Sequence, residues 1–236
     1  MRTLERSNAA TTQPGKVIVL ATGKGGVGKS TLVRSLAAHW MLAGRNPAVV
    51  DADPEHRVAR RHDKTGAMAA IPVIADANED TIGTRIRELK AQHGVVIVDT
   101  AGFRNKTQIM ACIEADVVLI PMKPAPDDVD EAVAMYELVQ ELNETPERKG
   151  RTIQAALVLT MVKRATVIAR SVQRDFLKAG LPLLDIEIKE RVAYPESAIR
   201  GQAPSITAPD GEAAFEIAAL AEQLEQLGEQ NHVKAA

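Results

Sequence analysis

A glycine-rich segment with two lysines and a serine is the part of the sequence best suited to chemistry. An apolar run over residues 16–21 leads into it and an amphipathic run over 32–42 follows it; the segment reads Gly23-Lys24-Gly25-Gly26-Val27-Gly28-Lys29-Ser30-Thr31. Its glycines let the backbone turn tightly and point successive N–H groups into one concavity, and a following helix adds partial positive charge at its N-terminus. The spacing predicts a P-loop, in which Lys29 reaches the β- and γ-phosphates of a nucleotide and the Ser30 hydroxyl holds Mg²⁺. The predicted nucleotide-binding residues are Gly25, Gly26, Val27, Gly28, Lys29, Ser30 and Thr31.

Lys24, directly after the first glycine, is not needed by an ordinary P-loop, because Lys29 already neutralises the phosphates. It could be no more than a solvated loop charge. The string K-G-G-V-G-K-S-T, however, resembles the deviant Walker A class of P-loop ATPases. That resemblance implies that Lys24 crosses the interface of a homodimer and contacts the partner's nucleotide, so that ATP lies between two subunits.

Two aspartates follow apolar runs, at positions where strands are expected to end. Asp99 ends the run over 94–98, which is the Walker B arrangement, in which a carboxylate reaches Mg²⁺ through water. Asp53 follows the run over 48–51, and V-V-D-A-D-P is similar to the switch I segment of ParA-type ATPases. The resemblance implies that Asp53 helps to set the attacking water and the Mg²⁺ shell, while Asp51 supports the loop. Helix capping by Asp53 is the alternative, and it is compatible with that role. Most relatives have glutamine where this chain has Glu55.

The rest of the chain alternates apolar runs typical of buried parallel strands with amphipathic stretches. This alternation predicts an α/β fold with a doubly wound, mostly parallel sheet flanked by helices. We expect one P-loop ATPase domain over 16–228, with a flexible leader over 1–15 and a polar tail over 229–236. Strands are expected at 16–21, 48–51, 71–74 (an edge strand), 94–99, 115–121, 152–161 and 181–186, and helices at 32–42, 81–92, 127–143, 167–179 and 211–228.

Composition limits the possible functions. The formal net charge of −2 gives no whole-molecule attraction to nucleic acid, so DNA binding would require a local basic patch. The single cysteine, Cys112, excludes an internal disulfide, argues for a reducing cytoplasm and counts against a shared iron–sulfur cluster. No apolar run is long enough to span a bilayer, so no membrane association is expected.

A surplus of basic residues between 163 and 200 is the candidate DNA surface. Arg170 and Arg174 are spaced i,i+4, which places like charges on one helix face. Pairing with neighbouring acids is the alternative. The segment over 190–206 is similar to the late basic-aromatic helix of ParA proteins, and this resemblance adds Arg191 and Arg200 as candidate DNA contacts. In relatives, residues matching 160–163 line the adenine pocket.

The string I-P-M-K-P-A-P-D-D-V-D-E-A resembles small plasmid-partition ParA proteins and the related VirC1 group. The ParA/MinD-type resemblance implies an ATPase that uses ATP and Mg²⁺, with Lys24, Lys29 and Asp53 as catalytic residues and Ser30 and Asp99 (through water) as metal ligands. It implies a cytoplasmic, nucleoid-associated homodimer that binds double-stranded DNA non-specifically. A ParB-like centromere-binding or cargo adaptor protein would stimulate slow hydrolysis, most simply to segregate plasmid DNA. Alternatives are a VirC1-like recruitment factor in conjugation, positioning of carboxysomes, a MinD-like membrane ATPase, and a metabolite-directed P-loop ligase or kinase.

Overall fold

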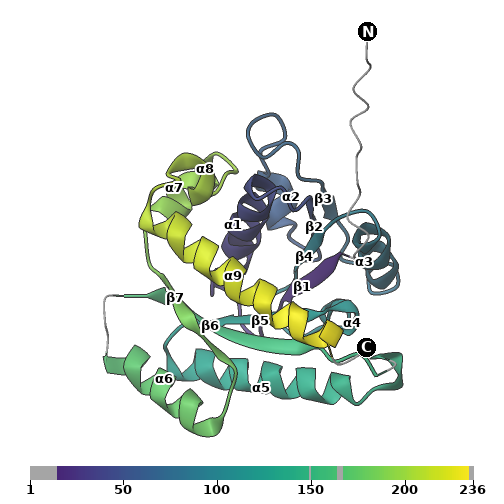
Figure 1. Ribbon diagram of the computed structural model, residues 1–236, viewed down its shortest axis with the longest axis vertical. Helices are drawn as coiled ribbons and strands as arrows, with labels where there is room; N and C mark the ends of the chain where they lie inside the picture. Colours follow the sequence, from purple (N-terminus) through teal and green to yellow (C-terminus); the bar gives the residue numbers. More distant parts are fainter. Residues whose placement is uncertain (1–14, 149, 164–166, 234–236) are drawn as a thin grey trace.

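The computed structural model describes residues 15–148, 150–163 and 167–233. Within these residues, seven strands form one sheet in which every pairing is parallel (Figure 1). This confirms the predicted doubly wound α/β fold. From one edge to the other, the strands are β3 (Val73–Ala75), β2 (Pro47–Asp51), β4 (Val95–Asp99), β1 (Lys16–Leu20), β5 (Val117–Met122), β6 (Gln154–Val162) and β7 (Leu183–Lys189).

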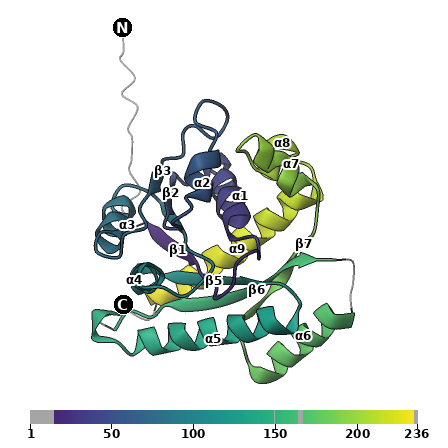
Figure 2. The same cartoon turned by 180° about the vertical axis from the view of Figure 1, so that it is seen from behind.

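Helices cover both faces of the sheet (Figures 1 and 2). One face carries α1 (Lys29–Leu42), α2 (Arg57–Arg61), α7 (Ala193–Ile199), α8 (Pro204–Thr207) and α9 (Glu212–Val233). The other carries α3 (Ile82–Lys90), α4 (Lys106–Glu114), α5 (Pro126–Asn143) and α6 (Val167–Ala179). None of the described helices is both long enough and apolar enough to cross a membrane.

The central strands β1, β4 and β5 are apolar along almost their whole length because each faces a core on both sides. In β1, Val17 and Val19 belong to the core under α3–α6, whereas Ile18 and Leu20 belong to the core under α1 and α9. All four side chains are fully buried. Burial on both faces is what the continuous apolar runs predicted.

The strand register sets the position of the chemistry. β1 pairs with β4 on one side and with β5 on the other, so the chain reverses its winding direction at β1. Asp99, the last residue of β4, is level with both Leu20 and Asp51. The P-loop, Asp51 and Asp99 therefore meet at the carboxyl edge of the sheet, beside the switch point where such folds bind ligands.

Several boundaries differ from the predicted ones. Helix α4 was not predicted, and α9 continues to Val233, past the expected end at residue 228. Helix α5 begins at Pro126 with Ala125 as its N-cap, so Asp127 and Asp128 lie in its first turn and do not cap it. The edge strand was predicted at the correct place in the sheet but begins at Val73. Almost all of the predicted leader lies outside the described residues.

Candidate nucleotide and magnesium site

The glycine-rich loop joins β1 to α1 and has the backbone that its sequence predicts. Gly26 and Gly28 have φ values of 80° and 91°, in the left-handed region that favours glycine, and α1 begins at the next residue, Lys29. The Thr160 hydroxyl of β6 donates to the Val27 carbonyl at 2.9 Å. The loop is thus anchored to the sheet while the N–H groups at the start of α1 have no intrahelical partner.

Lys29 lies inside the loop and is only 7% exposed. Its Nζ donates to Thr22 Oγ1 at 2.9 Å, and that hydroxyl donates to the Lys24 carbonyl at 2.7 Å. Burial lowers the pKa of Lys29, and the nearby Asp99 and Asp53 oppose this effect. An ammonium group has three donors, so Lys29 can keep its contact with Thr22 and still donate to phosphate oxygens.

Asp99 is completely buried, and neither of its carboxylate oxygens has a partner at hydrogen-bond geometry. Its pKa is raised to about 7, chiefly by burial and also by Asp51, although the Ser30 hydroxyl and the Lys29 ammonium oppose the shift. An orphaned buried carboxylate beside a hydroxyl fits a hard, oxygen-seeking cation. Within the described residues no three His, Cys, Asp or Glu side chains form a cage, which suits Mg²⁺, because that ion takes few protein ligands.

Asp51 supports the segment that follows β2, as predicted. It is fully buried, and its two oxygens accept the N–H groups of Asp53 (3.3 Å) and Ala59 (2.8 Å). Asp53 itself is half-buried, and its Oδ1 accepts the Glu55 N–H at 2.9 Å. Asp53 therefore stabilises a local turn and does not cap α2, which begins at Arg57. Glu55 is exposed and pairs with Arg57 at 2.6 Å.

Gln108 of α4 is a buried site residue that the sequence reasoning missed. Its Nε2 donates to the Thr22 carbonyl and to Thr100 Oγ1, both at 3.1 Å, so it connects the base of the P-loop to the loop after Asp99. A signal was present: Asn105 caps α4 by accepting the Gln108 N–H at 2.8 Å. An Asn followed three residues later by Gln is close to the capping-box pattern that marks a helix start.

Lys24 lies on the outer side of the loop, with its side chain 45% exposed. Its ammonium is 3.8 Å from Asp127 and 3.6 Å from Asp128, at the start of α5 of the same chain. The structure therefore separates the two lysines of the motif: Lys29 faces inward and Lys24 faces outward. Contact with a partner's nucleotide remains a prediction for Lys24.

Lys123, in the turn after β5, is a third lysine beside the loop and was not predicted. It is half-buried, and its Nζ lies 3.7 Å from the position that a Cβ on Gly26 would occupy. No carboxylate of the described chain lies within ion-pair distance of it. Lys123 is far from the motif in the sequence, and only the fold brings it close to the phosphate loop.

Of the residues expected near the adenine, Thr160 uses its hydroxyl on the P-loop. Met161 is 39% exposed and would contact a Cβ on Gly28 through its Cε at 3.5 Å. Lys163 is exposed and pairs with Glu190 at 3.7 Å. Residues 160–163 thus begin at the P-loop and end at the surface, and a role for them in adenine binding stays a prediction.

The four candidate DNA-contacting arginines do not form one surface. Arg170 and Arg174 are exposed on α6, whereas Arg191 and Arg200 flank α7 on the opposite face of the sheet (Figure 1). Arg191 donates to Glu216 at 2.9 and 2.7 Å and also pairs with Glu212; Glu216 raises its pKa. For Arg191 the structure therefore shows the alternative to DNA contact that was considered for this region, which is pairing with neighbouring acids. Arg200 is exposed, with no ion pair to any described residue.

Gly102, in the loop after Asp99, packs directly on the P-loop. A Cβ at this position would lie 2.6 Å from Gly25 Cα and 2.9 Å from Gly25 N, which is too close for either backbone to remain in place. We expect Gly102→Ala to displace the P-loop at a cost of about 1–3 kcal/mol. Titration of a fluorescent ATP analogue should show affinity lowered about tenfold.

Gly83→Ala is the matched control for this glycine. Gly83 lies within α3, and its nearest neighbours to an added Cβ are side-chain atoms at 3.4 Å or more. Alanine in a helix interior is favoured over glycine, so this variant should keep its nucleotide affinity and gain slightly in stability. Equal affinities for Gly102→Ala and wild type would contradict the assigned packing of the two loops.

Together, the fold and this site define a P-loop nucleotide-binding protein with the outward-facing second lysine of the deviant Walker A class. Residues 18–205 match the family CbiA, the CobQ/CobB/MinD/ParA nucleotide binding domain, and the chain belongs to this family. Protein ParA of Rhizobium radiobacter is 29% identical over 180 residues, which cover 75% of this chain and 80% of that protein. Maintenance of carboxysome distribution protein A of Halothiobacillus neapolitanus is 27% identical over 189 residues, covering 78% and 84%.

Solved structures support the fold. The septum site-determining protein MinD from Pyrococcus horikoshii, complexed with Mg-ADP, superimposes with a TM-score of 0.71 over 90% of this chain and 97% of that one. The two sequences are 17% identical, so this likeness shows the shared architecture. The chain is thus a ParA/MinD-family ATPase by its family membership and its fold.

Proposed function

We propose that this protein is a ParA-type ATPase that forms an ATP-sandwich homodimer, binds double-stranded DNA without sequence preference, and hydrolyses ATP when a partner stimulates it. The observation that carries the proposal is Lys24. It is a cation on the phosphate loop that points out of its own chain's site, where Lys29 already occupies the inner position. Among the described residues, its own chain offers Lys24 only the Asp127 and Asp128 carboxylates, at 3.8 and 3.6 Å, and a second subunit's phosphates would replace these contacts.

Different residues of this chain have different roles in phosphoryl transfer. Lys29 and the N–H groups of the P-loop bind and orient the phosphates, and Lys24 and Lys29 stabilise the charge that develops on the transferring group. Ser30 and Asp99 would hold Mg²⁺, Asp99 through water, and the ion would neutralise phosphate charge. Asp53 positions the attacking water. None of these side chains is a strong base, so unstimulated turnover should be slow.

Two exposed apolar side chains support the dimer. Phe103, next to Gly102, is 57% exposed, and Met161, beside Gly28, is 39% exposed. Both lie next to the P-loop, whose residues Lys24, Gly25 and Gly26 are also exposed. Apolar groups around a polar centre are a common composition for a protein interface, and a second subunit would cover them.

The relatives suggest the cargo. The similarity to Rhizobium radiobacter ParA supports plasmid DNA as cargo, handled through a ParB-like centromere-binding partner, with the ATP-bound dimer on the nucleoid in the cytoplasm. The similarity to a carboxysome distribution protein supports a second candidate, in which the same cycle positions a protein cargo through an adaptor. The chemistry at the nucleotide is the same in both.

The proposed cycle is tested by measuring ATP hydrolysis of the full chain alone, with random-sequence duplex DNA, and with DNA plus a candidate ParB-like partner protein. We expect slow turnover that rises when both are added. Turnover that responds to neither, but to a small metabolite, would contradict the proposal and favour a ligase or kinase.

Lys123 offers a test of the site itself. Because its ammonium lies beside Gly26, Lys123→Gln should weaken a charge-assisted contact with the phosphates and reduce ATP affinity about fivefold, equivalent to about 1 kcal/mol. Calorimetric titration with ATP and Mg²⁺ measures this. Lys106→Gln removes the same charge from a lysine that pairs with Glu79 on the surface, and it should bind ATP as the wild type does. Wild-type affinity for Lys123→Gln would exclude the phosphate contact.

A further inference from the structure

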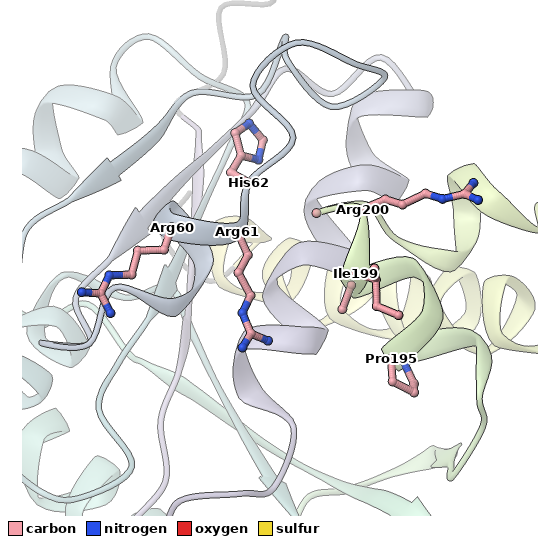
Figure 3. A pocket seen from close by; sticks show the side chains of 8 residues that line it. Arg60, Arg61, His62, Pro195, Ile199 and Arg200 are labelled. Carbon is pink, nitrogen blue, oxygen red and sulfur yellow. The ribbon is translucent and has the colours of Figure 1, made fainter.

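A solvent-open hollow of about 740 Å³ lies between α2 and α7, on the face of the sheet that carries α1 (Figure 3). One side is formed by the end of α2 and the residue after it, and the other by α7 and the turn that follows. Charged and apolar groups share the surface. The lining residues are Arg60, Arg61, His62, Pro195, Ala198, Ile199, Arg200 and Gly201.

Three uncompensated arginines give the hollow its charge. Within the described chain, no carboxylate lies within ion-pair distance of Arg60, Arg61 or Arg200. The nearby Asp63 carboxylate instead accepts the Gly66 N–H at 2.7 Å and Gln202 Nε2 at 2.9 Å. Glu196 of α7 is exposed but does not line the hollow. The hollow is therefore a cationic surface on a chain whose net charge is −2.

A buried arginine behind this surface adds to the excess of positive charge. Arg34 of α1 is 4% exposed, and its Nε has no hydrogen-bond partner. Burial lowers the pKa of Arg34, and the charge of Arg61 lowers it further, which shows that the two guanidinium groups repel each other. Burial also lowers the pKa of His62, so this imidazole is neutral at neutral pH. A bound anion would relieve the repulsion between the arginines.

The two sides of the hollow are held together by close packing. Gly201 has a φ of 68°, and a Cβ there would lie 2.0 Å from the Arg61 carbonyl oxygen, so only glycine permits this approach. The Gln202–Asp63 hydrogen bond joins the same two segments. Arginines that are far apart in the sequence are thus fixed on one surface.

The directions of the side chains indicate the shape of the ligand. In Figure 3 the side chains of Arg60, Arg61 and Arg200 point in different directions and do not converge on one point. A single phosphate could not contact all three, whereas a chain of phosphates spread over the surface could. Arginine is well suited to such contacts, because its planar guanidinium binds phosphate in a bidentate manner.

The hollow is also connected to the nucleotide site. Asp51 accepts N–H groups from Asp53, in the segment beside the nucleotide, and from Ala59, inside α2. Between them, His56 has a left-handed φ of 49°, and its carbonyl accepts the Arg60 N–H at 2.9 Å. A movement of Asp53 on binding of nucleotide would therefore be passed to Arg60 and Arg61.

We propose that the α2–α7 hollow is a contact site for the phosphate backbone of double-stranded DNA, positioned by the nucleotide through Asp51. This inference rests on the proposed function and assigns to it a surface that includes α2. Of the arginines predicted from the sequence to contact DNA, the proposed site keeps Arg200. It does not include Arg191, and it adds Arg60 and Arg61.

The test is binding of the full chain, with ATP and Mg²⁺, to a random-sequence duplex between about 50 and about 200 mM salt. Arg60→Gln/Arg61→Gln should lower the affinity about tenfold or more, and the slope of log affinity against log salt should fall by about two, one for each lost phosphate contact. Arg200→Gln should act in the same direction. Arg85→Gln/Arg87→Gln is the control: it removes two arginines of α3 that pair with Glu88 and Glu114, and it should bind as wild type.

The possible outcomes separate the two proposals. If the wild type binds no DNA with any nucleotide, the proposed function fails. If the wild type binds but the α2 variant keeps its affinity and salt slope, this site is excluded while DNA binding stands. Loss only in Arg170→Gln/Arg174→Gln would place the contact on α6, and loss of partner binding with DNA affinity intact would make the hollow a protein-docking site; each overturns the inference. Hydrogen exchange over residues 57–61 should change when ATP binds, and unchanged exchange would contradict the link through Asp51.

Discussion

Lys24→Ala should bind ATP with close to wild-type affinity and fail to dimerise. The ammonium of Lys24 points away from its own chain's inner lysine and pairs with the exposed Asp127 and the buried Asp128. If it meets phosphates of a second subunit, its removal takes a buried charge pair from an interface, which costs at least about 2 kcal/mol at each of the two symmetric sites. Over the two sites together the dimer should weaken about 1,000-fold or more. Sedimentation with ATP and Mg²⁺ measures this directly.

A matched lysine distinguishes this role from a general effect of charge. Lys163→Ala removes a surface lysine that pairs with Glu190, and it should dimerise as the wild type does. If Lys24→Ala also dimerises normally, then Lys24 is a solvated loop charge and the sandwich arrangement is wrong for this chain.

Asp99→Asn should have opposite effects on stability and on nucleotide binding. In the folded protein the pKa of Asp99 is raised to about 7, chiefly by burial, whereas an unfolded aspartate ionises near its ordinary pKa of 3.8. The folded state therefore holds this proton more tightly, and the cost of ionising Asp99 grows as the pH rises from about 4 to about 7 and is complete above that. Asparagine removes this cost. The nucleotide-free variant should thus melt at a higher temperature than wild type at about pH 8, and the difference should vanish below about pH 4.

The same variant should lose affinity for Mg²⁺ with nucleotide. A carboxylate that holds the ion through water acts as an outer-shell ligand, and such losses are about 10- to 100-fold. Thermal scans at the two pH values, with and without Mg-ATP, read both effects from one protein. If the variant is destabilised without nucleotide, or if it binds Mg-ATP normally, then Asp99 is not an unpaired carboxylate that serves to bind the ion.

Much of the fold could be predicted because its signals are local. The strands carry continuous apolar runs, and the bounds of α6 agree residue for residue with the predicted helix over 167–179. Helix α4 was not predicted, although Asn105 at its N-cap was a local signal for its start. Helix α9 continues past its predicted end although its last residues are polar, because a helix does not need an apolar stripe in its last turns.

The site residues likewise fall into those that local sequence reveals and those that depend on long-range packing. The P-loop and Asp99 are recognisable because the backbone they require is encoded within a few residues. Gln108 and Lys123 reach the loop only through the packing of elements far along the chain. The Asn105–Gln108 spacing marks a helix start but not its contact with the loop, and no local pattern marks Lys123. The pairing of Arg191 with Glu216 and the meeting of Arg61 with Gly201 are likewise long-range. These contacts determine which arginines have no carboxylate partner in the described part of the chain. Counting charges along the sequence could not identify those arginines.

The most direct test of the account is binding of the full chain to a random-sequence DNA duplex with ATP, with ADP and without nucleotide, over a series of salt concentrations. We expect binding only with ATP, no dependence on sequence, a steep loss of affinity with salt, and no binding by Lys24→Ala. Binding that is equal in all three nucleotide states would contradict gating by the nucleotide. Absence of binding in every state would contradict the assignment to a DNA-bound ParA-type cycle. The protein would then be an ATPase that acts on another ligand.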